Sequence, residues 1–339
     1  MAEPDPSPRR PRLVLAMRPD ILDLVLPAPV RARLDALADV HPAPVTDWAA
    51  PDAAAPLAAA DVLLTGWGCP PLDAAALDRA PRLAAVLHAA GTVKGHVRPE
   101  VWQRGIAVSS AADANAAPVV EFTLATVWLA ARGALGASAA YARGELPTYR
   151  SRRGADGATI GVIGASRIGR GVIDRLRAAP TGFRILLADP YVTAAEAAAL
   201  GAEHVDPDEL CRRSDIVTVH APDLPETHHL LDARRLALLP DGAAVINTAR
   251  GRLVDTAALT AECATGRLDA YLDVTDPEPL PPDHALHRLR NVLLTPHIAG
   301  CQGTEVQRLG GYAVDELERW TLGEPLLGAV RADDLARIA

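Results

Sequence analysis

The sequence predicts an α/β protein with two doubly wound parallel-sheet domains, and three observations support this fold class. Short, continuously apolar runs alternate with helical segments along most of the chain, which is typical of strands covered by helices on both faces. One of these runs leads directly into a glycine turn and then a helical segment, the order found where parallel sheets bind dinucleotides. The chain has 339 residues, enough for two domains of ordinary size.

The first block of the chain contains four candidate strands and one clear helical pattern. The helical pattern covers residues 30–38, where Val30, Leu34 and Leu37 recur at helical spacing. The candidate strands are residues 12–17, 61–65, 83–87 and 106–109. Such a block is expected to form one parallel sheet with helices between its strands.

The second block has enough candidate strands for a doubly wound sheet of its own. A helical segment at residues 119–131 precedes it, with Pro118 expected in the first turn, where a missing N–H costs nothing. A last helical segment, residues 304–322, ends at Gly323. The candidate strands are residues 159–163, 184–188, 216–219, 244–247, 270–274 and 292–295. Two such domains predict a cleft between them, which is a common place for a ligand.

The strand, turn and helix at residues 159–169 read TIGVIGASRIG. Gly164 follows the apolar run and Gly169 opens the helical pattern, so the helix would present free backbone N–H groups to a pyrophosphate. Asp189 comes about 20 residues later, where an acidic side chain can accept hydrogen bonds from a ribose. Ser166 stands at the second glycine position of the motif: its Cβ would crowd the pyrophosphate, while its hydroxyl can donate to a phosphate oxygen. The alternative reading is an ordinary turn that binds no nucleotide.

The composition narrows the possible partners and the compartment. A net charge of −8 argues against nucleic acid or an anionic membrane as the main partner, although a local basic cleft remains open. The four cysteines are far apart and lack metal-binding spacing, so we expect a reducing, cytoplasmic environment, no disulfides and no metal site. The longest strongly apolar stretch, residues 122–131, is too short to cross a bilayer, and the N-terminus has no signal-peptide core.

Three later stretches place polar residues at or just beyond strand ends. Arg250 follows the strand at 244–247, Glu278 lies beyond the strand containing Asp273, and His297 follows the last strand. The carboxyl ends of parallel strands line the ligand crevice of an open sheet, so we expect these residues to face the same cleft as the glycine turn.

These residue types suit hydride transfer to a 2-keto acid. An arginine fork matches the geometry of the substrate carboxylate. A histidine that titrates near neutrality can give a proton to the keto oxygen, and a carboxylate beside it fixes its tautomer and raises its pKa. A nicotinamide would supply the hydride. The sequence offers no serine or cysteine elbow, metal cluster or Walker lysine that would favour another chemistry.

The motifs together resemble one family, the NAD-dependent D-2-hydroxyacid dehydrogenases, which include phosphoglycerate dehydrogenases and hydroxypyruvate reductases. They occur in family order between about residues 83 and 300, as HAAGTV, RGIAVSS…NAAPVVEFTLA, GVIGASRIGR, VTVHAPDLPETHHLL, NTARGRLVD, LDVTDPEPLP and NVLLTPHIAG. The resemblance implies a flavodoxin-like substrate domain at residues 1–113, completed by residues 300–339, and a Rossmann NAD-binding domain at 114–299. It also implies a cytoplasmic homodimer, paired through residues 122–128, that interconverts a small D-2-hydroxy acid and its 2-keto acid.

The resemblance further implies a role for each matching residue. Arg250 would orient the substrate carboxylate and carbonyl, His297 would be the general acid and base, and Glu278 would pair with it. Asp273 would hold the nicotinamide carboxamide. The cofactor would also meet Gly164, Ser166, Arg167, Ile168, Gly169, Asp189, His220, Ala221, Pro222, Thr227, Thr248, Ala249, Arg250 and His297. The substrate would meet backbone N–H groups of Ala90, Gly91 and Thr92, with Asn115 near the active site.

Some alternatives stay open at this stage. The protein could instead be a non-catalytic NAD(H)-sensing binding protein, or a dehydrogenase that prefers NADP or a phosphorylated substrate. Lys94 follows the substrate loop where many family members have Asp or Asn, and is either a surface lysine or a contact for an anionic substrate group. The other histidines are expected at the surface, namely His88, His96, His204, His228, His229, His284 and His287.

Overall fold

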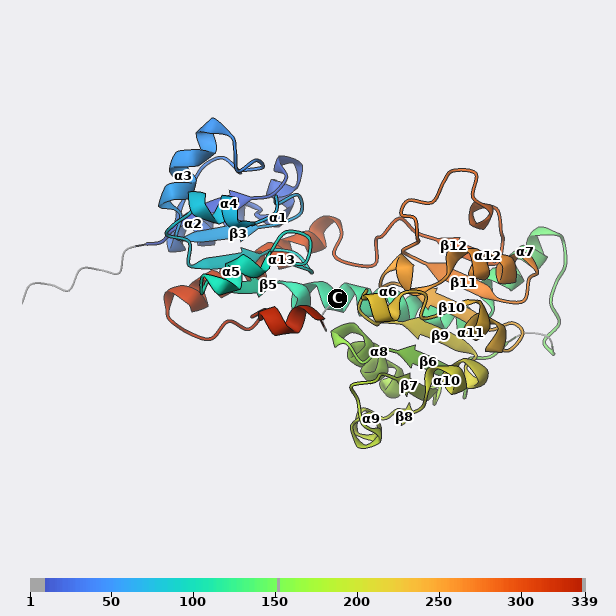
Figure 1. Ribbon diagram of the computed structural model, residues 1–339. Helices are drawn as coiled ribbons and strands as arrows, with labels where there is room; N and C mark the ends of the chain where they lie inside the picture. The colour runs from blue at the N-terminus through green and yellow to red at the C-terminus, as the bar shows by residue number, and fades with distance from the viewer. Residues whose placement is uncertain (1–9, 151–152, 337–339) are drawn as a thin grey trace, which may run out of the picture. The chain divides into compact units, whose positions relative to one another are not determined.

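The computed structural model describes residues 10–150 and 153–336. Contacts divide the chain into two compact units: the first holds the chain up to Asn115 and from Cys301 onward, and the second holds Ala116–Gly300. Each unit contains one sheet with helices around it, and the paired strands of both sheets are parallel (Figure 1). The predicted fold class, two parallel-sheet α/β domains, is confirmed.

The sheet of the first unit has the strand order β2-β1-β3-β4-β5, which is the flavodoxin-like order. Its strands are β1 (Arg12–Ala16), β2 (Asp39–Val40), β3 (Val62–Thr65), β4 (Ala85–His88) and β5 (Ala107–Ser110). Its helices are α1 (Leu22–Val25), α2 (Ala28–Leu37), α3 (Ala54–Ala59), α4 (Ala74–Arg79), α5 (Pro99–Gln103) and α13 (Val306–Thr321). Alternate residues of β1 enter two separate cores, with Leu13 and Leu15 in one and Val14 in the other, because strand side chains alternate between faces.

The C-terminal segment is built into this first unit. A Cβ at Gly310 of α13 would lie 1.7 Å from the carbonyl oxygen of Val25, so glycine allows α13 to approach α1 closely. Glu316 of α13 is buried, and its carboxylate accepts bonds from Ser109 Oγ and from the backbone N–H of Gly328. This buried acid therefore holds the end of the chain against β5.

The sheet of the second unit has the order β12-β11-β10-β9-β6-β7-β8. Its strands are β6 (Thr159–Ile163), β7 (Arg184–Ala188), β8 (Glu203–His204), β9 (Ile216–Val219), β10 (Ala244–Asn247), β11 (Asp269–Leu272) and β12 (Val292–Leu294). Its helices are α6 (Ala112–Ala131, which starts in the first unit), α7 (Ala134–Ala142), α8 (Arg167–Ala178), α9 (Ala194–Leu200), α10 (Pro207–Arg213), α11 (Ala233–Leu238) and α12 (Thr256–Ala264). The strand order reverses between β6 and β9, which is where a doubly wound sheet opens a ligand crevice beyond its carboxyl ends.

Helix α6 differs from its sequence prediction. It begins at Ala112, so Pro118 lies inside it and not in its first turn. Proline has no N–H to give the carbonyl one turn earlier, and that carbonyl, of Ala114, instead accepts a weak bond from Cys301 Sγ at 3.7 Å. Because the earlier turns are included, α6 is the one helix among the described residues that is long and apolar enough to cross a membrane, so the expectation of too short a segment is wrong. This test uses length and composition alone, and 44% of its most apolar stretch is buried in the protein.

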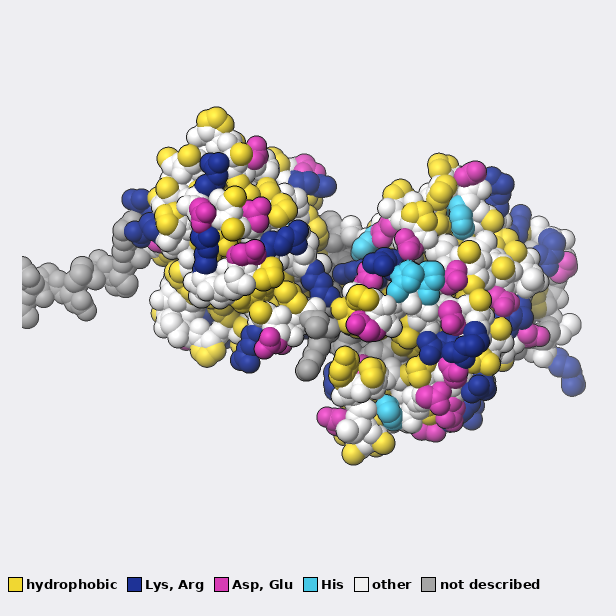
Figure 2. Space-filling view, viewed as in Figure 1, with side chains coloured by type: hydrophobic (Ala, Val, Ile, Leu, Met, Phe, Trp, Pro, Cys, Tyr) yellow, Lys and Arg dark blue, Asp and Glu magenta, His cyan; other side chains and the backbone are white. Residues whose placement is uncertain are grey.

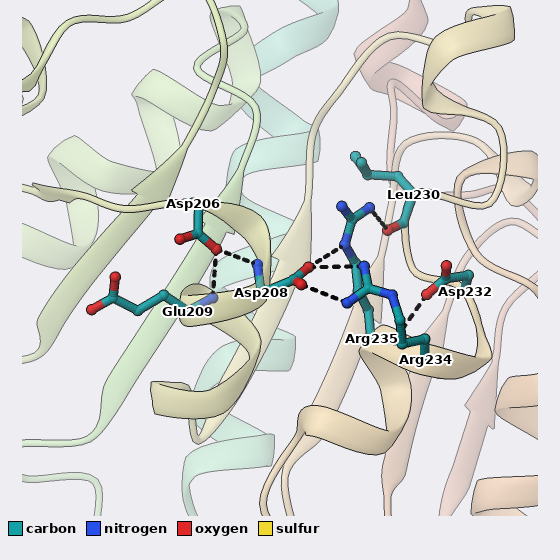
Figure 3. A network of polar contacts seen from close by, with 7 residues as sticks. All are labelled: Asp206, Asp208, Glu209, Leu230, Asp232, Arg234 and Arg235. Atoms are coloured by element: carbon teal, nitrogen blue, oxygen red, sulfur yellow. Dashed lines mark hydrogen bonds and ion pairs between the residues drawn. The ribbon is translucent and has the colours of Figure 1, made fainter.

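A charged network on the second unit joins α10 to α11 (Figure 3). Asp206 caps α10 by accepting the N–H groups of Asp208 and Glu209. The carboxylate of Asp208 accepts bonds from Arg234 and Arg235 of α11, which hold its pKa below the usual range. These groups are solvated, so the network joins two helix ends and adds little to stability.

Candidate active site

The glycine turn is the best-defined part of the candidate site. Gly164 has a φ of 97°, and a Cβ there would lie 2.6 Å from the backbone nitrogen of Ala221. A Cβ at Gly169 would lie 2.0 Å from the carbonyl oxygen of Gly164. Neither position can take a larger residue without moving backbone, so the tight turn at the start of α8 depends on both glycines.

Ser166 has a local role that explains the departure from the glycine motif. It is the N-cap of α8, and its Oγ accepts the N–H of Gly169 at 3.3 Å. Serine is a favoured N-cap residue. Because its oxygen is the acceptor in this bond, its hydroxyl hydrogen can still be donated to a phosphate oxygen.

Asp189 follows β7 and fastens the same turn. Its carboxylate accepts the N–H of Ala165 at 2.7 Å and that of Tyr191 at 2.8 Å. The side chain thus lies directly beside the glycine turn, as a ribose contact requires. Its contact with a ribose stays a prediction.

Several other predicted cofactor residues adjoin this turn. His220 is buried, its Nε2 lies 2.9 Å from Thr218 Oγ1, and its Nδ1 has no partner among the described residues. Ala221 follows it against Gly164, Arg167 and Ile168 form the first turn of α8, and Thr227 Oγ1 donates to the carbonyl of Pro222 at 2.6 Å. The buried, unpartnered Nδ1 of His220, next to the glycine turn at the start of α8, fits a bound dinucleotide. Thr248 differs, since its hydroxyl is buried 2.9 Å from that of Thr123.

Glu278 and His297 are paired, as the sequence predicts. The Nδ1 of His297 lies 2.7 Å from Oε1 of Glu278, and both side chains are about half exposed. A carboxylate at Nδ1 places the imidazole proton there and leaves Nε2 for a reacting group. The pair can therefore give and take a proton at Nε2.

Asp273 holds the loop that carries His297. Its Oδ1 accepts bonds from Thr295 Oγ1 at 2.6 Å and the N–H of Ile298 at 2.8 Å, and its Oδ2 accepts the N–H of Ala299 at 2.8 Å. His297 itself has a left-handed φ of 56°, which a side chain adopts only when its surroundings hold it there. Asp273 is thus a positioning residue in this structure, and its predicted contact with nicotinamide stays a prediction.

Arg250 follows β10 and is half-buried beside the pair. Its guanidinium donates to the carbonyl of Ala249 at 2.6 Å, while Asn247 binds the Arg250 carbonyl through Nδ2 at 2.8 Å. Burial lowers the pKa of Arg250, and the negative charges of Asp223 and Glu278 oppose that shift. Arginine stays charged in proteins, so the site holds a fixed cation near an acid–histidine pair.

Gly251 brings the loop after β11 beside Arg250. A Cβ at Gly251 would lie only 1.9 Å from the carbonyl oxygen of Thr275. Sequence reasoning missed this residue, as well as Asn247 and Thr295, because it looked for reactive groups and not for the residues that hold them. All three lie within the quoted motifs, next to the residues they support.

The predicted substrate residues of the first unit follow β4. Ala90 is buried, Gly91 and Thr92 are half-buried, and Asn115 Nδ2 would lie 3.3 Å from a Cβ at Gly91. Asn115 Oδ1 also accepts the N–H of Cys301 at 3.0 Å. Asn115 therefore lies against the predicted substrate loop, although no contact with substrate is tested.

The expectation that His88 and His96 lie at the surface is wrong. Both are buried, with 4% and 5% exposure, and Thr65 Oγ1 lies 2.9 Å from His88 Nδ1 and 3.3 Å from His96 Nε2. Their rings are 4.4 Å apart between centroids. Thr65 comes from the neighbouring strand, a partner that spacing along the chain cannot show. His88 also forms a hydrogen bond with the backbone of Thr92, and so it helps to hold the predicted substrate loop in place.

The buried histidines predict an acid-sensitive fold. Burial lowers the pKa of His88 well below its usual range, that of His96 to about 4 and that of His220 to about 3. The unfolded chain takes up protons near pH 6.5 and the folded chain only at lower pH, so the free energy of unfolding should fall as pH drops from about 6.5 to about 4. Urea unfolding at a series of pH values measures this. His96→Asn should reduce the dependence of the unfolding free energy on pH, whereas His287→Ala, at an exposed histidine, should not. A urea midpoint that is constant between pH 7 and 5 would contradict the prediction.

Comparison with known proteins finds a matching family and several related proteins. The family described as D-isomer specific 2-hydroxyacid dehydrogenase, NAD binding domain, matches residues 124–299. A D-3-phosphoglycerate dehydrogenase of Methanocaldococcus jannaschii is 39% identical over 218 residues, which are 63% of this chain and 41% of that protein. A glyoxylate reductase of Thermofilum pendens is 34% identical over 75% of this chain and 76% of its own length. The chain thus spans less than half the length of the phosphoglycerate dehydrogenases it matches.

Solved structures agree with the fold over nearly the whole chain. A protein from Thermus thermophilus is 31% identical, with a TM-score of 0.74 over 94% of this chain and all of its own. A phosphoglycerate oxidoreductase from Rhizobium etli is 27% identical, with a TM-score of 0.78 over 95% of this chain and 98% of its own.

Proposed function

Because the chain belongs to the D-isomer-specific 2-hydroxyacid dehydrogenase family, we propose that it is an NAD-dependent oxidoreductase that interconverts a small D-2-hydroxy acid and its 2-keto acid. The observation that carries the proposal is the 2.7 Å bond between Glu278 and His297, with the Arg250 cation close to Glu278. The match to the family's NAD-binding domain supports NAD as the cofactor.

Each residue has one task in the proposed reduction. The Arg250 guanidinium binds the substrate carboxylate and orients the carbonyl. His297, protonated, donates from Nε2 to the carbonyl oxygen, and Glu278 stabilises the imidazolium until the proton leaves. A nicotinamide held by the glycine-turn residues would supply the hydride. In the oxidation direction His297 takes the hydroxyl proton back.

The glycine turn and its neighbours would hold the cofactor. Gly164 and Gly169 allow the tight turn that would present the N-terminus of α8 to the pyrophosphate, and the Ser166 hydroxyl can donate to it. Asp189 would accept bonds from the adenosine ribose, and its charge repels the 2′-phosphate of NADP. NAD is therefore the preferred cofactor in this proposal.

The proposal is tested by following NADH oxidation with glyoxylate, hydroxypyruvate, pyruvate and a phosphorylated 2-keto acid. We expect turnover with at least one of them, and faster turnover with NADH than with NADPH. In the reverse direction, D-isomers should react and L-isomers should not. Tight NADH binding without turnover of any 2-keto acid would instead favour the non-catalytic sensor.

Asp189→Ala is expected to weaken NADH binding by about tenfold or more. The substitution removes charged hydrogen bonds of about 1.5–3 kcal/mol to the ribose, and also releases the Ala165 N–H that braces the turn. Fluorescence titration with NADH measures the effect, with Asp174→Ala on the exposed face of α8 as the control. Equal NADH affinity in wild type and Asp189→Ala would show that Asp189 does not contact the cofactor.

The assembly and location complete the proposal. We propose a homodimer that pairs through the region of residues 122–128, free of nucleic acid and membrane, in the cytoplasm. The exposed Leu129 beside this region supports the dimer. The net charge of −8 supports the absence of nucleic acid and anionic membrane as partners. The four cysteines are free thiols, as a reducing compartment allows. Light scattering on the purified chain measures the assembly, and a monomer would refute the dimer.

A further inference from the structure

We propose that His228, His229 and Asp276 form a binding site for a divalent transition-metal ion such as Zn²⁺. One ligand atom from each of these three side chains lies within 4.8 Å of the other two. Imidazole nitrogen and carboxylate oxygen are both ligands of Zn²⁺, at about 2.0–2.2 Å. Two ligand atoms on one such ion are about 3–3.5 Å apart, so rotation of the side chains, including the two histidine rings, would complete the coordination.

The backbone explains how two consecutive histidines can serve one ion. Successive side chains of an extended chain point to opposite faces, but His229 has a left-handed φ of 51°. This brings its ring beside that of His228, with centroids 3.9 Å apart and planes 19° apart. The nitrogen lone pairs lie in the ring planes, so the two rings must rotate out of this stack to bind one ion. The conformation is held by the N–H of His229, which donates to the carbonyl of Arg252 at 2.8 Å.

The third ligand comes from a segment far along the chain. Asp276 lies in the loop after β11, which reaches this place because Gly251 leaves room for Thr275. Within the described residues, neither the His228 ring nor the Asp276 carboxylate makes a hydrogen bond, so their ligand atoms are available to an ion. Asp255 lies 3.8 Å from Nδ1 of His229, where a carboxylate can orient an imidazole ligand.

The exposure of the cluster suits an ion that exchanges with solvent. His228 is exposed, and His229 and Asp276 are half-buried. Figure 2 shows histidine side chains gathered with acidic and basic ones on the visible face of the second unit. Three protein ligands leave at least one coordination position for water or a small anion. The prediction of no metal site followed from the cysteine spacing, and this cluster contains no cysteine.

An ion at this site would join two segments of the second unit. His228 and His229 follow the cofactor residues Pro222 and Thr227, and Asp276 lies two residues before Glu278. The site itself does not depend on the proposed dehydrogenase reaction. Ion binding can therefore be measured whether or not any 2-keto acid is turned over.

The test uses the full chain without a histidine tag, stripped with a chelator and titrated with Zn²⁺ in competition with a chromogenic chelator. We expect one Zn²⁺ per chain for wild type. His228→Ala, His229→Asn and Asp276→Asn should each weaken the affinity by at least about tenfold. Asparagine is chosen at position 229 because it tolerates a left-handed φ.

The matched control is His287→Ala, which removes an exposed histidine outside the cluster. It should bind Zn²⁺ as wild type does. Thermal unfolding in the metal-free state shows whether each variant is folded, and Zn²⁺ should raise the Tm of wild type and His287→Ala only. No stoichiometric Zn²⁺ binding by wild type, or equal affinity in folded cluster variants, would overturn the proposal.

Discussion

Replacing His297 by alanine is expected to lower kcat by about 10²–10⁴-fold, while NADH still binds. This is the usual contribution of a positioned general acid or base. The Glu278 carboxylate, 2.7 Å from Nδ1 of His297, would be left without an imidazolium to stabilise, and no proton would reach the substrate oxygen from Nε2. Steady-state rates with the best 2-keto acid measure kcat. Titration of the same protein with NADH measures cofactor binding.

A second variant distinguishes the loss of the imidazole from a change in the conformation of its loop. His297 has a left-handed φ that alanine adopts poorly, whereas asparagine tolerates it. His297→Asn should therefore keep the loop held by Asp273 and lose kcat as alanine does. His284→Ala, at a half-buried histidine in another loop, is the control. Near-normal turnover by the asparagine variant would show that His297 is not the proton donor.

Replacing Arg250 by lysine is expected to lower kcat/KM by about 100-fold. The guanidinium can bind a carboxylate through two parallel bonds, and an ammonium cannot reproduce that fork. Losing charged hydrogen bonds costs about 1.5–3 kcal/mol, which corresponds to about 10- to 150-fold, and about 100-fold lies near the upper end of that range. The positive charge remains, so NADH affinity and the fold should change little.

Arg252→Lys is the matched control for this prediction. It makes the same substitution two residues away, at a side chain that is 55% exposed and lies 3.7 Å from Asp223. Its kcat/KM should stay close to that of wild type. If Arg250→Lys and Arg252→Lys behaved alike, the assignment of Arg250 to the substrate carboxylate would be wrong.

Much of the fold follows from local pattern. The glycine turn at Gly164 and the apolar runs on either side of it predict β6, α8 and β7, because strand and helix periodicity and glycine conformation act over a few residues. The same patterns fail where a distant contact decides. They predict too late a start for α6, which contains Pro118 in its interior. The carbonyl that Pro118 leaves without its helical partner contacts Cys301, far along the chain.

The candidate site, like the fold, could be predicted only in part from the sequence. The residue types and their strand-end positions name Arg250, Glu278 and His297 without coordinates, and the parallel order of β10, β11 and β12 explains why their loops are neighbours. The sequence does not reveal that Asp273 is fully engaged with the His297 loop, or that His88 and His96 are buried around Thr65. Their partners come from other strands and other loops.

Local order along the chain was therefore enough to predict the two parallel-sheet domains and the family, which are confirmed, and to name reactive residues whose roles stay predictions. The structure shows the pairing of Glu278 with His297 that the sequence predicts. The anchoring by Asp273 and the meeting of His228 and His229 with Asp276 became visible only in the folded molecule. The physical reason is strand register: parallel pairing brings loops from distant parts of the chain to one edge of a sheet, and no spacing within a single motif records which side chains meet there.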